Sequence, residues 1–349
     1  MTVDRQARPR QHFRPFQPNQ WSAFDMCGIE NDKNHPNTRQ LLEGLPKNWG
    51  KWGPDDEVGA LNYLQQAEVL RGVAAVRQGK TFTLQVQIGH PGGDPMWPAR
   101  NPSMRFNTLD RSHYQAGKQP SMTGGAEYCD DVIFMQLQGS TQYDALGHAW
   151  YDNQLWNGYD ASSTVGGMAK ASVLPIAERG VVGRAVLIDM ARHRGKKYLG
   201  RGETFNHLDL LAAAQAQGVA IEKRDILIIR TGSMGAFYEY GKTEFFKDLV
   251  EPGLTYSREL VDWFNQMEIP NLVTDTIANE VITDPVSGVQ IPLHCALMRN
   301  LGIAFTEIVL LEELAEDCAV DGQWTFLYTA APLKIVGGSG APVNPIVIK

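Results

Sequence analysis

Residues 138–148 read QGSTQYDALGH and follow the apolar run VIFM at 132–135. Side chains two and four residues apart on a strand point to the same face. We therefore expect Gln138, Gln142 and Asp144 to converge, with His148 close by. Amide, carboxylate and imidazole groups gathered on one face are more typical of a functional site than of a core, so this segment is where we place the chemistry.

The composition is that of a globular protein and argues against several classes of function. The chain has 349 residues, of which 43% are hydrophobic and 20% charged, enough for a large core. A net charge of −7 without a basic stripe predicts no nucleic-acid partner. No apolar run is long enough for a membrane helix, and residues 1–16 lack the apolar segment of a secretory signal. The four cysteines are widely spaced without a CxxC pair, so we expect reduced thiols and a cytoplasmic location.

The order of the expected elements indicates an α/β fold with an extended N-terminal arm. Residues 1–47, rich in Pro, Arg, Gln and Asn, form the predicted arm, and residues 48–349 form the predicted domain. The periodicity predicts helices over 64–78 and 208–216, and strands over 81–88, 181–189, 225–232, 269–276 and 326–333. Residues 89–125, rich in Gly, Pro, Asn and Ser, are expected to form a long loop. Strands and helices that alternate without a clear linker are typical of one α/β domain.

A second polar cluster lies downstream, at His294 and Glu307, separated by a predicted helix over 295–299 and a break at Gly302. A histidine and a glutamate on either side of one helix can return to the same point in space. With Asp144 and His148 they would supply two imidazoles and two carboxylates, which suits zinc or manganese. A lone histidine is more often an ordinary core or surface residue, so spacing alone leaves both interpretations open.

The two clusters resemble the signature of the cyclase-like metal-dependent hydrolases, the family that includes bacterial kynurenine formamidase and isatin hydrolase. Thr141, Asp144 and His148 match the motif HxGTHxDxPxH, whereas Gln138 and Gln142 stand in place of two histidines. Residues 293–294 and 302–307 resemble the second motif, in which a histidine and a glutamate complete a metal site. Further likeness to a longer bacterial branch is seen at 48–56, 151–158, 182–187, 230–232 and 330–345. The resemblance implies a swivelling β/β/α domain that assembles as a homodimer or homotetramer.

The resemblance also implies one divalent ion, manganese or zinc, held by Asp144, His294 and Glu307. Gln138 or Gln142 would be a weak additional ligand, since an amide oxygen binds zinc less well than imidazole does. Three outcomes stay open: an ion held in this way, a preference for a harder ion such as Mn²⁺, or loss of the metal with acid–base chemistry in the polar pocket.

The implied activity is that of a hydrolase, an amidohydrolase or lactonase, in which a metal-activated water opens a small cyclic amide or lactone, or cleaves a small amide or ester. His148 would be the general base and then the acid, while Thr141 and Gln142 orient the water or donate to the oxyanion. The alternatives are a metal-independent lyase, isomerase or cyclase with His148 and Asp144 as acid–base pair, or a catalytically silent binding protein. The side chains expected to contact the small-molecule substrate are Trp97, Phe106, Tyr143, Trp150 and Arg230, although core packing and a structural ion pair explain them as well.

Overall fold

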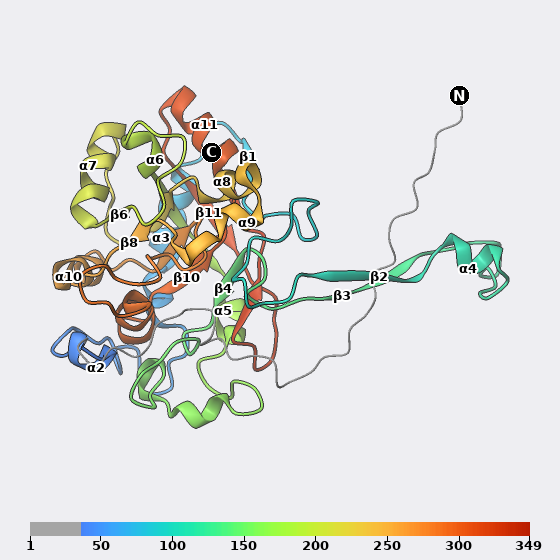
Figure 1. Cartoon of the computed structure of the whole chain (residues 1–349), viewed down its shortest axis with the longest axis horizontal. Helices are drawn as coiled ribbons and strands as arrows, with labels where there is room; N and C mark the ends of the chain where they lie inside the picture. Colours follow the sequence, from blue (N-terminus) through green and yellow to red (C-terminus); the bar gives the residue numbers. More distant parts are fainter. Residues whose placement is uncertain (1–35) are drawn as a thin grey trace. The chain divides into compact units, whose positions relative to one another are not determined.

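A nine-stranded mixed sheet lies at the centre of the computed structural model, which describes residues 36–349 (Figure 1). In sheet order its strands are β1 (Thr81–Thr83), β13 (Ile346–Ile348), β11 (Thr325–Ala330), β5 (Val181–Asp189), β7 (Ile226–Arg230), β9 (Asn271–Thr274), β10 (Ala304–Glu307), β4 (Gln142–Asp144) and β12 (Gly340–Pro342). The four strands from β5 to β10 run parallel, and the outer strands pair antiparallel. The expected α/β class is confirmed. Most of the predicted arm, up to residue 35, lies outside the described residues.

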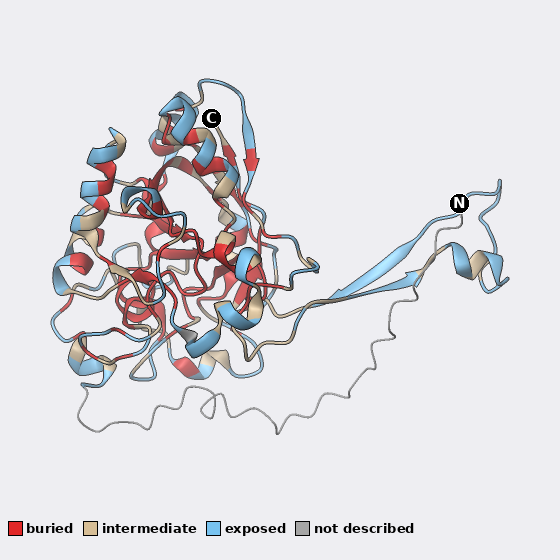
Figure 2. Cartoon of the chain, turned by 45° about the horizontal axis from the view of Figure 1, so that its top comes forward, coloured by how far each residue is buried: buried red, intermediate tan, exposed pale blue. Residues whose placement is uncertain are grey.

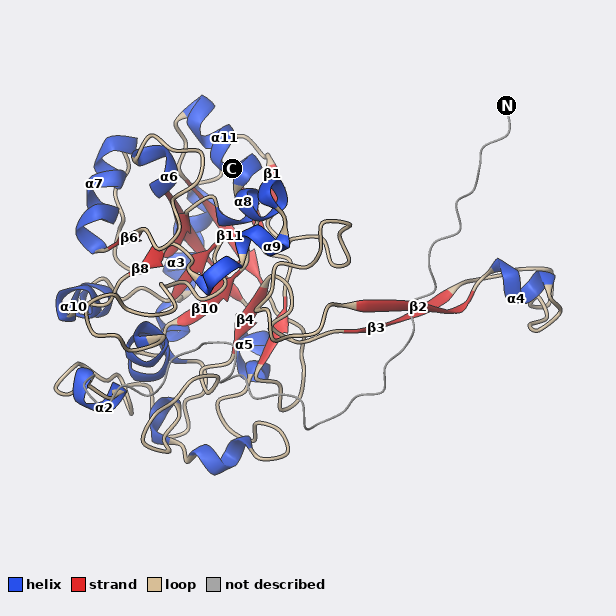
Figure 3. Cartoon of the chain, in the orientation of Figure 1, coloured by secondary structure: helices blue, strands red, loops and turns tan. Residues whose placement is uncertain are grey.

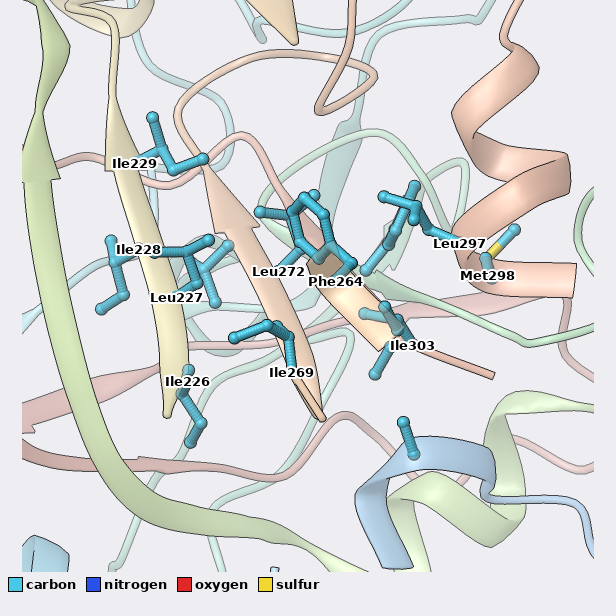
Figure 4. Close-up of a cluster of buried hydrophobic side chains, with 14 of the residues drawn as sticks. Ile226, Leu227, Ile228, Ile229, Phe264, Ile269, Leu272, Leu297, Met298 and Ile303 are labelled. Atoms are coloured by element: carbon cyan, nitrogen blue, oxygen red, sulfur yellow. The ribbon is translucent and has the colours of Figure 1, made fainter. Parts of the chain in front are cut away.

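The central parallel strands are buried on both faces, which explains why their sequences are continuously apolar. All five residues of β7 are buried, and β5 spans the same residues, 181–189, that the sequence predicts as a strand. Figure 4 shows Leu227 of β7 in a cluster with Leu272 of β9 and Phe264. Parallel sheets covered by helices on both sides characteristically read as runs of Val, Ile and Leu.

Helices cover the sheet (Figure 3). They are α3 (Gln66–Ala74), α5 (Val173–Arg179), α6 (Met190–His193), α7 (His207–Gln217), α8 (Ser233–Tyr240), α9 (Lys242–Phe245), α10 (Arg258–Gln266) and α11 (Glu312–Asp321), and the short α2 (Thr38–Leu41) precedes them. The Asn206 side chain accepts hydrogen bonds from the backbone N–H groups of Leu208 and Asp209 at the start of α7. The helix ends at Gly218, which has the left-handed conformation. Helix α3 lies so close to β5 that a Cβ at Gly72 would come within 2.7 Å of the Gly183 backbone.

Shorter segments complete the described chain. A second small sheet pairs β6 (Thr204–Phe205) with β8 (Gly253–Leu254). The 3₁₀ segments are η1 (Gly59–Tyr63), η2 (Trp156–Gly158), η3 (Ala161–Thr164) and η4 (Lys247–Leu249). The helix expected over 295–299 is a π-helix, η5 (His294–Asn300). It is followed by Gly302 at φ +75°, where a Cβ would lie 2.7 Å from the Trp156 ring. In the part of the chain that the structure describes, no helix has the length and apolarity to cross a bilayer.

Residues 104–134 differ from the sequence prediction. The loop expected over 89–125 contains β2 (Met104–Leu109) and α4 (Arg111–Gln115), and β2 pairs with β3 (Asp130–Phe134) in a two-stranded hairpin. Figure 2 shows both strands in the colour of exposed residues. The prediction of a loop was wrong because the strands are short, exposed on both faces and separated by a polar, Gly-rich stretch, so neither shows the buried pattern that identifies strands elsewhere.

Candidate metal centre

The two polar clusters of the sequence meet at the carboxyl end of β10. Strand β4 pairs antiparallel with β10, so that Gln142 lies opposite Glu307, and β12 places Gly340 opposite Asp144. Ligands of open α/β sheets bind outside the carboxyl ends of the parallel strands. The sheet thus brings residues 144 and 307 together, although they are far apart in the sequence.

Asp144, His294 and Glu307 form a compact buried group. One potential ligand atom from each lies within 4.8 Å of the others. The His294 Nε2 atom is 3.5 Å from Glu307 Oε1 and 4.0 Å from Asp144 Oδ2. All three residues are at most 4% exposed. A single atom placed between them could contact all three at once.

The surroundings of the Asp144 carboxylate indicate whether Asp144, His294 and Glu307 suit a metal ion. Both of its oxygens are buried and have no hydrogen-bond partner. A buried carboxylate without a partner is costly, and buried charges in proteins are usually paired or bind metals. A divalent cation would satisfy both oxygens, and carboxylate and imidazole are ligands that such ions accept. The residues present therefore fit a divalent ion.

Glu280 determines the orientation of the His294 ring. Its Oε1 atom lies 2.7 Å from His294 Nδ1 and accepts from the His294 backbone N–H at 2.7 Å, and its Oε2 atom accepts from Leu293 N. Because Nδ1 is hydrogen-bonded to Glu280, Nε2 is the ring nitrogen that faces Asp144 and Glu307. A carboxylate behind the ring is a regular feature of metal-binding histidines. Although burial lowers the pKa of His294, its hydrogen bonds with Glu280 and Glu307 raise it to about 10, so a metal ion would displace a proton from this ring.

Two amides hold Glu307 in place. Gln142 Nε2 donates to Glu307 Oε2 at 2.8 Å, and Asn279 Nδ2 donates to Glu307 Oε1 at 3.1 Å. Because the amide nitrogen of Gln142 faces the carboxylate, its Oε1 atom is left without a partner and is buried. Burial, together with the charge of Asp144, raises the pKa of Glu307 to about 7.

Of the other predicted site residues, His148 lies near the centre, whereas Gln138 and Thr141 have other partners. Burial and the charges of His294 and Arg100 lower the pKa of the partly buried His148, and Asp144 opposes this shift. Gln138 donates to Ser339 Oγ at 3.1 Å. The Thr141 hydroxyl donates to the Ile308 carbonyl and accepts from Val86 N, so it joins two backbone segments.

The structure does not gather the five predicted substrate contacts around the centre. The Tyr143 hydroxyl donates to Asn271 at 2.7 Å in the core, on the opposite face of β4 from Asp144. Arg230 pairs with Asp189 at 3.0 Å, which is the structural alternative considered for it. Phe106, in the hairpin, and Trp150 are 45% and 43% exposed. Trp97 packs against a small apolar cluster of Val86, Met234, Ile277 and Ile308.

Glu280 and Asn279 were not identified from the sequence. They occupy the turn after β9, and they reach the centre only because that turn folds back toward β10. The signal that could have found them is the polar pair Asn-Glu that follows the two apolar residues 277–278, shortly after the end of β9.

Comparison with known proteins gives a consistent family and fold. A family model described as "Putative cyclase" matches residues 82–281. A crystal structure described as that of a novel cyclase is 36% identical, with a TM-score of 0.78, and the match covers 87% of this chain and 98% of that one. Isatin hydrolase A from Labrenzia aggregata is 17% identical with a TM-score of 0.54, covering 82% of this chain and 98% of its own. The Ralstonia solanacearum enzyme is also 17% identical, with a TM-score of 0.54 and coverages of 77% and 91%. The two isatin hydrolases show similarity of fold alone. No curated protein matches the chain.

Proposed function

Because this chain belongs to the cyclase family, we propose that it is a metal-dependent hydrolase that opens a small cyclic amide or lactone, or cleaves a small amide or ester. The observation that carries the proposal is the buried Asp144 carboxylate, which has no hydrogen-bond partner and lies beside His294 and Glu307. The proposed substrate class is taken from the resemblance of Thr141, Asp144 and His148 to the signature of the family that includes isatin hydrolase.

The ion would be held by Asp144, His294 and Glu307, with the free Oε1 of Gln142 as a fourth ligand. Three oxygen ligands and one nitrogen favour manganese over zinc, because imidazole and thiolate are the better zinc ligands. A divalent ion held by these residues would supply Lewis-acid chemistry, making a water more acidic and polarising a carbonyl group. Glu280 and Asn279 keep His294 and Glu307 in the orientation that this requires.

His148 is the proposed general base. Its pKa is lowered mainly by burial, so the imidazole is neutral at neutral pH and able to accept a proton. It takes a proton from the water that attacks the carbonyl, and it then donates this proton to the leaving nitrogen or oxygen. Thr141 supports this geometry indirectly, by fixing the Ile308 backbone next to Glu307.

We propose further that the protein forms a homo-oligomer. In this oligomer the β2–β3 hairpin of one copy contacts a second copy. Phe106 and Val132 lie opposite each other on one face of the hairpin, and Met104 and Phe134 form the next pair on that face. Phe106, Val132 and Phe134 are each at least 45% exposed. A lone hairpin is at most marginally stable, and an apolar face that meets its own symmetry copy is self-complementary. The carboxylate of Asp130, two residues before Val132 on the same strand, lies beside this face and disfavours a lipid surface as the partner.

Elemental analysis of the purified protein and of Asp144→Asn tests the metal centre. We expect nearly one manganese or zinc ion per chain in the wild type and its loss in Asp144→Asn. Hydrolysis of a panel of lactones and cyclic amides should be lost with it. Asp131→Asn is the matched control, because it removes an exposed carboxylate of the hairpin and should keep both metal and activity. A wild type that stays metal-free after incubation with both ions would contradict the proposal and favour the metal-free acid–base enzyme that uses His148 and Asp144.

A further inference from the structure

Arg100 is a cationic residue beside the candidate metal centre that the proposed mechanism does not use. Its Nη1 atom donates to the Gln138 backbone carbonyl at 2.8 Å. The Gln138 side chain lies against Gly340, the residue opposite Asp144, since a Cβ at Gly340 would come within 2.7 Å of Gln138 Nε2. Arg100 is therefore attached to the segment that leads into β4 and its Asp144.

The electrostatics of the centre agree with this position. Burial is the largest influence on the pKa of His148 and on that of Glu307, and the nearby charge of Arg100 lowers both. The guanidinium group is thus close to the proposed general base and to a proposed metal ligand.

One edge of the Arg100 guanidinium group is free. In the part of the chain that the structure describes, the Gln138 carbonyl is the acceptor for this side chain, and no carboxylate lies within ion-pair distance of it. Its Nε and Nη2 atoms have no partner there and are not buried, so solvent reaches them. These two atoms form one edge of a planar, permanently charged group that matches the two oxygens of a carboxylate. The free edge is therefore an accessible group for binding an anion.

The loop that carries Arg100 is held in place by Asp94. This residue is 4% exposed, and its two carboxylate oxygens accept from Gly89 N and Ser103 N, each at 2.9 Å. The Arg100 backbone N–H donates to the Trp97 carbonyl at 2.9 Å, which closes a turn. A guanidinium group on a loop fixed in this way loses less conformational entropy when it binds a ligand.

The charges of the centre leave that of Arg100 uncompensated. Asp144 and Glu307 have the His294 ring as their neighbour, at 4.0 and 3.5 Å. A dication held by these two carboxylates would balance their charges. A cationic group left over beside a substrate site favours an anionic molecule over a neutral one of the same shape.

We propose that Arg100 binds a carboxylate group of the substrate, separate from the ester or amide group that is hydrolysed. This inference rests on the proposed function, and it narrows the substrates to lactones, amides or esters that carry a carboxylate. Arg100 is then a substrate-binding residue without a part in proton transfer, because its guanidinium group stays protonated. His148 remains the proposed base.

A binding experiment on the full-length protein at pH 7 tests this contact without turnover. Benzoate is an anion, and nitrobenzene has the same planar shape without a net charge. We expect benzoate to bind about 10–100-fold more tightly by calorimetry or ligand-observed NMR, the value of a hydrogen-bonded charge pair. Arg100→Gln should weaken benzoate by this factor and leave nitrobenzene unchanged. Arg100→Lys should keep part of the preference, because the charge stays and the planar fork is lost.

Two controls locate the probe. Arg201 is 40% exposed in its side chain, pairs with Asp248 at 3.3 Å and lines an apolar cavity beside α8. Arg201→Gln should leave both affinities unchanged, and loss of benzoate binding in this variant would place the probe in that cavity and overturn the proposal. Elemental analysis should find the same metal content in Arg100→Gln as in the wild type. A folded Arg100→Gln protein without metal would show that Arg100 has a structural role instead.

Hydrolysis of two lactones tests whether the carboxylate belongs to the substrate. γ-Butyrolactone-γ-carboxylate and γ-butyrolactone-γ-carboxamide share the ring and the bond that is cleaved, and they differ in charge. Arg100→Gln should lower kcat/KM for opening of the carboxylate lactone about 10–100-fold, mainly through KM, and leave the carboxamide lactone unchanged. Equal losses for both would mean that Arg100 acts on the reacting carbonyl, which overturns the proposal.

Failure of this proposal and failure of the proposed function give different results. A metal-containing wild type that opens lactones but binds benzoate no more tightly than nitrobenzene would overturn the role of Arg100 and leave the hydrolase intact. Benzoate binding that depends on Arg100, in a protein that holds no metal and opens neither lactone, would overturn the hydrolase and leave the carboxylate contact. If Arg100→Gln does not fold, the wild-type preference and its decrease in Arg100→Lys still decide the question.

Discussion

Glu280 is the residue on which the orientation of the metal centre depends most. It accepts hydrogen bonds from the His294 ring and from two backbone N–H groups, all at 2.7 Å. A glutamine at this position has one acceptor oxygen instead of two, so it cannot satisfy all three donors. The ring would then lose the carboxylate that holds Nε2 toward Asp144 and Glu307.

We predict that Glu280→Gln weakens manganese or zinc binding about 10–100-fold, the usual cost of losing the carboxylate behind a metal-binding histidine. Competition with a chromophoric chelator measures the change. Glu239→Gln is the matched control, since Glu239 is an exposed residue paired with Lys197 and should leave the affinity unchanged. A folded Glu280→Gln protein with wild-type affinity would show that Glu280 does not orient a ligand.

The sequence identifies the residues of the centre better than it identifies their supports. Asp144, His294 and Glu307 could be predicted because polar residues beside apolar strands stand out and resemble known motifs. Thr141 and Tyr143 were chosen for the same reason, but the alternation of strand side chains turns the residues adjacent to Gln142 away from the centre. Asn279 reaches Glu307 through the path of a turn, which residue spacing does not specify.

At the level of elements, prediction succeeds where burial leaves a pattern. The strands β5 and β7 were found because both of their faces are covered, which requires continuous apolar residues. The β2–β3 hairpin was missed because its exposed strands are under no such requirement. The hairpin is nonetheless two-sided: Phe106 and Val132 pair on one face, and Arg105 forms an ion pair with Asp131 on the other.

The difference between the two faces of the hairpin leads to a prediction for the oligomer. Replacing Phe106 and Phe134 together by serine should convert the homo-oligomer into a smaller species, because it removes the apolar side chains that we expect to contact a second copy. Multi-angle light scattering measures the mass. Ile133→Ser is the control, since Ile133 is 46% exposed on the opposite face of the same hairpin and should leave the mass unchanged. An unaltered mass for the double variant would exclude this face as the contact.

At the scale of the whole molecule, several buried carboxyl groups lie near the carboxyl edge of the sheet. Burial raises the pKa of Glu251 to about 8, and it raises those of Asp275 and Glu307 to about 7. The folded protein therefore holds protons that the unfolded chain has already released at neutral pH. When the folded state binds more protons than the unfolded state, stability falls as pH rises. The same edge that fits a cation thus makes the metal-free fold less stable as the pH rises from about 4 to about 8.

Glu251 makes this sensitivity measurable. Its pKa rises from 4.5 to about 8 on folding, so its cost to stability is absent below about pH 4.5, grows up to about pH 8 and is constant above that. We predict that, in the presence of a chelator, the wild type loses roughly 3–5 kcal/mol more stability between pH 5 and pH 8 than Glu251→Gln does, since the amide is neutral throughout. Guanidinium denaturation followed by tryptophan fluorescence measures both proteins. Glu244→Gln, which alters an exposed carboxylate, should follow the wild type. Parallel curves for the wild type and Glu251→Gln would mean that Glu251 ionises in the folded protein as it does in water.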